Sequence, residues 1–138
     1  MTALLVVHAF ATLYMVGLVW FVQVVHYPMF ADVPEPAFAA YSAEHSRRTS
    51  WVVGPPMLAE GGAALVIAAL APSPLALTGA GLVLALAGIT LLVSARCHGR
   101  LALGFDAGQH RRLVTTNWLR TALWTARGAI ALALLAGA

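Results

Sequence analysis

The most restrictive feature of the sequence is four long apolar stretches, at about residues 3–27, 54–71, 75–96 and 110–136. An α-helix needs about 20 apolar residues to cross the hydrocarbon core of a bilayer, and there it satisfies its own backbone hydrogen bonds. The chain is 61% hydrophobic and only 9% charged, whereas soluble domains carry about a quarter charged residues. We therefore predict an all-α integral membrane protein, a single domain of residues 1–138 folded as a four-helix transmembrane bundle.

The segment at residues 37–53 is too polar to cross a membrane, so we predict an additional amphipathic helix there, between the first two spans. Glu44 and Arg48 are four residues apart, in the order that favours an ion pair along one helix. A Gly-Pro-Pro sequence follows at residues 54–56, and proline interrupts or kinks a helix because it lacks an amide hydrogen. We expect the amphipathic helix to end there and to lie at the membrane surface.

Arginine residues gather in two of the three connections between the spans, and the chain contains no lysine. Basic residues in short loops mark the cytoplasmic side of a membrane protein. We therefore expect the first and third connections, with the amphipathic helix, on the cytoplasmic side and both termini outside. No basic cluster lies elsewhere, so nucleic acid is not an expected partner. The arginines concerned are Arg47, Arg48, Arg96, Arg100, Arg111 and Arg112.

The last span differs from the other three because it carries polar side chains along one face. At about 100° per residue, Asn117, Thr121, Trp124 and Gly128 form a narrow stripe, with Arg120 and Arg127 along one edge. Leu119, Leu123, Ala126 and Ile130 take the opposite face. Ionisable residues inside a membrane usually face the interior of a bundle, so we expect this stripe to face the other helices.

The predicted topology brings several proton-binding side chains to the cytoplasmic end of the bundle. Histidine is a common metal ligand, and helix bundles often hold metal or haem between facing helices. We interpret His26, His45 and His98 as candidate cofactor ligands, with Glu44 as a further metal ligand. The alternative is that these side chains are interfacial residues that bond to lipid headgroups or to loop backbone. The complete set at this end is His26, Tyr27, Glu44, His45, His98 and His110.

A second group of candidate functional residues lies deeper in the spans. We expect Glu60 to pair with Arg127 or Arg120, because a buried carboxylate is neutral or paired. Two arginines against one glutamate leave a surplus positive charge, which suits an anionic ligand. We therefore assign candidate catalytic or substrate-binding roles to Glu60, Asn117, Arg120 and Arg127. The alternative is a buried ion pair that fixes the register of the helices.

Four short spans, a His-Tyr-Pro sequence at residues 26–28 and an Asn-Trp-Leu-Arg-Thr sequence at residues 117–121 resemble small bacterial four-helix membrane proteins. The overall pattern also resembles the anthrone-oxygenase-like family. The resemblance implies a multi-pass protein of the bacterial inner membrane and an oxidative enzyme. The resemblance names no cofactor and assigns no role to a residue of this chain.

These features predict a membrane-embedded metal- or haem-binding redox enzyme that acts on a small hydrophobic or anionic ligand. Two alternatives remain open. One is a small proton-coupled transporter or channel that uses Glu60 and Arg127 and works as a homo-oligomer. The other is a structural or assembly protein of the lipid bilayer without catalysis.

Overall fold

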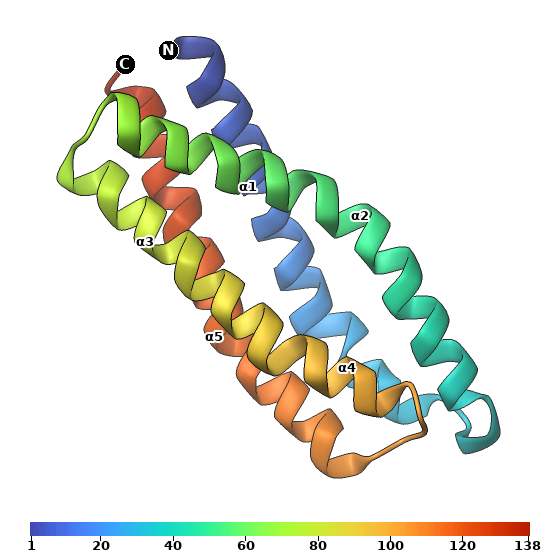
Figure 1. The fold of residues 1–138 in the computed structure, drawn as a ribbon. Coiled ribbons are helices and arrows are strands. Elements are labelled where there is room, and N and C mark those ends of the chain that lie inside the picture. Colours follow the sequence, from blue (N-terminus) through green and yellow to red (C-terminus); the bar gives the residue numbers. More distant parts are fainter.

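The computed structural model describes all residues, 1–138, as four long helical rods that lie side by side (Figure 1). The first rod contains three consecutive helical segments: α1 (Thr2–Phe21), a π-helical turn (Val22–His26) and a 3₁₀ turn (Pro28–Asp32). The other rods are α2 (Glu35–Leu70), α3 (Pro74–Ile89) continued by a π-helical turn (Thr90–Ser94) and α4 (Ala95–Leu101), and α5 (Ala107–Ala136). All four rods are long and apolar enough to cross a membrane. Both termini lie at one end of the bundle (Figure 1).

The structure corrects the prediction of a separate amphipathic helix that ends at residues 54–56. α2 is one continuous helix with Pro55 and Pro56 inside it. A helix tolerates proline where packing against neighbouring helices and local adjustments satisfy the remaining backbone groups. At 36 residues, α2 is about 54 Å long, which exceeds the roughly 30 Å hydrocarbon core of a bilayer. The predicted amphipathic segment is therefore the polar first half of this long helix.

The other helix boundaries differ from the predicted spans by a few residues. The first rod passes the predicted end at residue 27, because Pro28 begins a 3₁₀ turn instead of ending the helical path. The third rod continues through its π-helical turn to Leu101. The fourth begins at Ala107 rather than near residue 110, because the Asp106 carboxylate accepts a hydrogen bond of 2.8 Å from the Gln109 amide, a stabilising N-cap.

The interior of the bundle is polar for a protein of this composition, and its outer surface is apolar. Ten of the 31 buried residues are polar or charged, whereas Phe10, Leu58 and Leu84 are 74%, 79% and 65% exposed. Such an arrangement is favourable in lipid, where polar side chains face the bundle interior. The buried polar residues are His8, Thr12, Gln23, Ser42, Glu60, Ser94, Asn117, Arg120, Thr121 and Arg127.

Three small apolar clusters hold the rods together along their length. One, around Leu5 and Ile67, lies near the termini, and a second, around Met15 and Trp124, lies midway. The third contains Phe30, Phe38 and Cys97. It lies at the end of the bundle opposite the termini, which we call the loop end (Figure 1). Cys97 is 1% exposed inside this third cluster.

At Gly128, α5 lies so close to α1 that there is little room for a side chain. A Cβ atom at this position would lie 3.1 Å from Val16 Cγ2 and 3.6 Å from Leu13 Cδ2. We expect Gly128→Leu to force α1 and α5 apart and to lower stability by about 1–3 kcal/mol, the usual effect of overpacking. The thermal unfolding midpoint in mild detergent measures this. Gly62→Leu on α2 is the control, since a Cβ at Gly62 has nothing within 4 Å; equal midpoints for the two variants would contradict the prediction.

Candidate functional site

A cavity of about 390 Å³ lies among the rods, between the middle and loop-end clusters, and it is partly open to the surface because Ser50, Ala95 and Gly99 in its lining are exposed. Side chains of α1, α2, α4, α5 and both π-helical turns line it. Its inner part is apolar, with Met15, Leu18, Val19, Val53 and Met57 among the lining residues. Its other part is polar and is lined by Tyr27, His45, Ser46, Thr49, Thr90, Ser94, His98, Asn117 and Arg120. This bundle cavity therefore suits a molecule with one apolar and one polar end.

A cluster of histidines and one tyrosine surrounds the polar part of the bundle cavity. Tyr27 Oη and His98 Nε2 form a hydrogen bond of 2.9 Å, and His26 Nε2 and His45 Nδ1 form one of 2.8 Å. The His45 and His98 rings are 5.4 Å apart between centroids. His110 Nε2 lies 2.7 Å from the Tyr27 carbonyl oxygen. The predicted convergence of these five residues, here named the histidine–tyrosine cluster, is thus confirmed.

Arg120 reaches the same cavity from α5. It is 7% exposed, its Nη1 donates to Asn117 Oδ1 at 2.9 Å, and Asn117 Nδ2 donates to Gln23 Oε1 at 2.8 Å. None of the three ion pairs in the structure includes Arg120. Asn117 and Gln23 therefore position a buried guanidinium whose charge no carboxylate neutralises.

Six of the ten buried side-chain polar atoms that lack a hydrogen-bond partner within the protein belong to residues of the bundle cavity. Buried polar atoms are almost always satisfied by protein, by ordered water or by a bound molecule. Their concentration here distinguishes the cavity from the rest of the interior. The six atoms are His45 Nε2, Ser46 Oγ, Thr90 Oγ1, Ser94 Oγ, His98 Nδ1 and Arg120 Nε.

Both π-helical turns of the chain border this cavity. Val22 of the first turn and Thr90 and Ser94 of the second line it. A π-helical turn inside an α-helix interrupts the regular backbone hydrogen bonds, and such turns are frequent at functional sites. The two turns thus place irregular backbone on opposite rods at the same level of the bundle.

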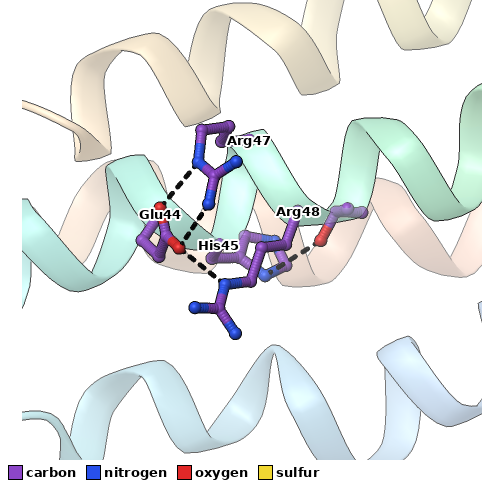
Figure 2. A network of polar contacts seen from close by, with 5 residues as sticks. Glu44, His45, Arg47 and Arg48 are labelled. Carbon is purple, nitrogen blue, oxygen red and sulfur yellow. Dashed lines mark hydrogen bonds and ion pairs between the residues drawn. The ribbon is translucent and has the colours of Figure 1, made fainter.

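Glu44 does not join the histidine–tyrosine cluster. Its carboxylate accepts two hydrogen bonds from Arg47, at 2.8 and 2.7 Å, and one from Arg48 at 2.6 Å. Figure 2 shows these two arginines on opposite sides of the glutamate. The predicted ion pair of Glu44 with Arg48 is confirmed, and the carboxylate is already fully engaged on the outside of α2.

The donor atoms in the cluster fit a metal ion only in part. His45 Nε2 and His98 Nδ1 have no partner within the protein, whereas His26 Nε2 is engaged by His45. No group of three or more histidine, cysteine, aspartate or glutamate side chains has a metal-binding arrangement, and catalytic zinc sites usually have three protein ligands. The cluster therefore offers two imidazole nitrogens without a partner, fewer than such a site usually has.

Glu60 and Arg127 form a second, separate polar site. Arg127 Nη2 donates to the Glu60 carboxylate, and Nη1 donates to the Gly79 carbonyl. The two side chains are 3% and 1% exposed, and His8 Nε2 lies 3.4 Å from Arg127 Nη2. Neither Glu60 nor Arg127 lines the bundle cavity. The expected pairing of Glu60 is confirmed with Arg127, and the pair joins α1, α2, α3 and α5.

Several residues of these sites are missed by sequence reasoning. Ser46, Thr90 and Ser94 line the cavity, but single hydroxyl groups are common in apolar helices. Gln23, which holds Asn117, is also missed. Its signal in the sequence is a polar side chain in a largely apolar span.

Comparison of the chain with models of known protein families, with curated proteins and with solved structures finds no match.

Proposed function

We propose that this protein is a membrane-embedded enzyme of the oxidoreductase class, which binds a small hydrophobic molecule with an acidic hydroxyl or carboxyl group in the bundle cavity. The observation that carries the proposal is the group of buried, unpartnered polar atoms around a partly apolar cavity. Arg120 adds a buried positive charge without a carboxylate. A bound anion would satisfy these atoms and neutralise that charge.

The histidine–tyrosine cluster would remove the proton of the bound molecule. The ring nitrogens of His45 and His98 that lack a partner within the protein are the atoms that would accept this proton, and His98 is held by its hydrogen bond with Tyr27. Arg120 would stabilise the anion that forms, as preorganised charges do in active sites. Loss of the proton makes a phenol-like molecule electron-rich and easier to oxidise. An oxidative step on such a molecule is also what the resemblance to the anthrone-oxygenase-like family implies.

The location that we propose is the bacterial inner membrane, with the histidine–tyrosine cluster at the cytoplasmic end and both termini outside. Support comes from the arginines at the loop end, which include Arg47, Arg48, Arg96 and Arg100. Both termini lie at the opposite end of the bundle (Figure 1). A cysteine accessibility assay at each end of the protein in intact cells would test this orientation.

A redox metal or haem remains part of the proposal, with His45 and His98 as the residues that would hold it through their unpartnered nitrogens. Either group would supply the electron-accepting centre. The test is an absorption spectrum with elemental analysis of protein purified in mild detergent. A Soret band or a stoichiometric metal that is lost in His98→Ala would support this centre. Colourless, metal-free protein that cannot be reconstituted would overturn the oxidoreductase part of the proposal, because oxidation of the bound molecule needs an electron acceptor.

The binding step can be tested with 2-naphthol, a small aromatic molecule whose absorption spectrum differs between the neutral and ionised forms. We expect wild-type protein in lipid nanodiscs to bind this probe in its ionised form at neutral pH. Binding of the neutral form alone, or no saturable binding, would overturn the proposed function.

Tyr27→Phe should weaken binding of ionised 2-naphthol by about fivefold, because the loss of one hydrogen bond amounts to about 1 kcal/mol. The change removes only the hydroxyl that contacts His98. Tyr14→Phe is the matched control, since Tyr14 lies on the same rod and is 44% exposed. The dissociation constant of each variant is measured by the same spectral titration. An equal effect of the two substitutions would show that the Tyr27 hydroxyl has no specific role.

The transport alternative depends on Glu60 and Arg127, and the structural observations favour another role for them. Both side chains are buried in a direct ion pair and lie away from the bundle cavity. We assign them to holding the helices in register. Proton-coupled flux in liposomes that is lost in Glu60→Gln would support transport instead.

A further inference from the structure

A second cavity, of about 500 Å³, lies between α1 and the first half of α2. Phe21 and Val52, which line it but not the bundle cavity, are 56% and 45% exposed. Its apolar part is therefore open to the surface that faces lipid. Its polar part is lined by His26, Tyr41, Glu44 and Arg48. We call this cavity the α1–α2 groove.

The α1–α2 groove and the bundle cavity share part of one wall. The shared residues are Leu18, Val22, His45, Thr49 and Val53, each of which lines both spaces. All five belong to the first rod or to α2, so the two spaces meet along the contact between these rods.

His45 forms the polar end of this wall. Its Nδ1 lies 2.8 Å from His26 Nε2 and 3.2 Å from Thr49 Oγ1. The His26 and His45 rings are 4.6 Å apart between centroids. Val22 and His26 belong to a π-helical turn, where the regular backbone ladder is interrupted. Rotation of the two imidazoles would join the groove to the cavity without moving a helix.

Charge favours an anion at the mouth of the groove. Arg48 lines it, and its side chain is 75% exposed. Only Arg48 Nε donates to Glu44, so both terminal nitrogens can bind another group. Arg47, on the other side of Glu44 in Figure 2, uses Nε and Nη2 on that carboxylate and does not line the groove.

We propose that the α1–α2 groove is a lateral entrance through which a small hydrophobic molecule with an acidic hydroxyl or carboxyl group passes from the lipid bilayer into the bundle cavity. Arg48 is the outer contact for the acidic group, Arg120 is the inner one, and the His26–His45 pair is the barrier between them. The identity of the passing molecule rests on the proposed function. The passage itself is argued independently of that function, from the residues that line both spaces.

The test is the reaction rate of a cysteine placed inside the bundle cavity. Ser46 lines that cavity but not the groove, and Ser46→Cys replaces one oxygen by sulfur. N-phenylmaleimide, a small lipid-soluble thiol reagent, is added to vesicles that contain this variant. The parent protein gives the background, since its one cysteine, Cys97, is 1% exposed.

Val52→Trp, combined with Ser46→Cys, should slow this labelling about tenfold, because access that needs a further conformational change is slower. Leu58→Trp on the same helix is the matched control. Leu58 is 79% exposed and lines neither space, so its labelling rate should equal that of Ser46→Cys alone. An unfolded variant would react faster, so slower labelling cannot arise from misfolding. Equal rates in the two tryptophan variants would overturn the proposal and make the groove a surface covered by lipid.

A second measurement separates this proposal from the proposed function. Arg48→Gln should slow the association of 2-naphthol with nanodiscs several-fold, while Arg47→Gln should not. If wild-type protein binds no 2-naphthol, the proposed function fails, yet the labelling experiment still decides whether the entrance exists. If 2-naphthol binds but Val52→Trp leaves labelling unchanged, the proposed function stands and the entrance fails.

Discussion

Arg127→Met should destabilise the protein by about 3–5 kcal/mol, the usual effect of removing one member of a buried ion pair. The Glu60 carboxylate would remain at 3% exposure without its cation. The Gly79 carbonyl, which accepts from Arg127 Nη1, would lose a charged donor at the same time. The midpoint of thermal unfolding in mild detergent, or the yield of folded protein, measures this loss.

The double variant Glu60→Gln/Arg127→Met is the control for this prediction. It removes both charges, so no carboxylate is left without a partner, and replacing a buried ion pair by neutral residues is often close to neutral in stability. We expect it to recover most of the lost stability. If Arg127→Met is as stable as wild type but inactive, Glu60 and Arg127 act in chemistry or transport rather than in holding the helices.

Arg120→Gln should weaken binding of ionised 2-naphthol by roughly ten- to a hundredfold. A hydrogen bond to a charged group is worth about 1.5–3 kcal/mol, and each 1.4 kcal/mol is about tenfold in affinity. Glutamine keeps an amide that can donate to Asn117 Oδ1, as Arg120 does, so the local structure should persist. The dissociation constant from the spectral titration is the measurement.

Stability should respond in the opposite way at Arg120 and at Arg127. Arg120 has no carboxylate partner, so its replacement removes a buried charge and leaves none behind. We expect the unfolding midpoint of Arg120→Gln to equal or exceed that of wild type. Arg112→Gln, at an exposed position, is the control for net charge and should change neither property. A large loss of stability in Arg120→Gln would indicate a structural arginine and count against the anion site.

Arg120 and Arg127 show how much of the candidate sites could be predicted from the sequence. Their spacing on one helix, seven residues apart, placed both on the edge of a single polar stripe. That stripe does face the interior, since Asn117, Thr121 and Trp124 are each at most 1% exposed. Helical periodicity cannot tell which neighbouring helix each arginine meets. Glu60 of α2 reaches only Arg127, so the residues form two sites.

The histidines illustrate the same limit at the loop end. Topology alone brought His26, His45 and His98 to one end of the bundle, because each lies near the end of a span or in a connection. Whether they touch depends on the length of α2, whose continuity through Pro55 and Pro56 places His45 against His26. Glu44, next to His45 on the same helix, bonds instead to Arg47 and Arg48.

The sequence by itself determined the helical class, the four long apolar helices and the polar face of the last one. These properties follow from the number, length and periodicity of apolar residues, which act within one helix at a time. Only the tertiary structure decided the path of α2, the partner of each arginine and the cavity between the helices. Those features depend on side chains of different helices meeting in space, and no spacing along the chain records which of them meet.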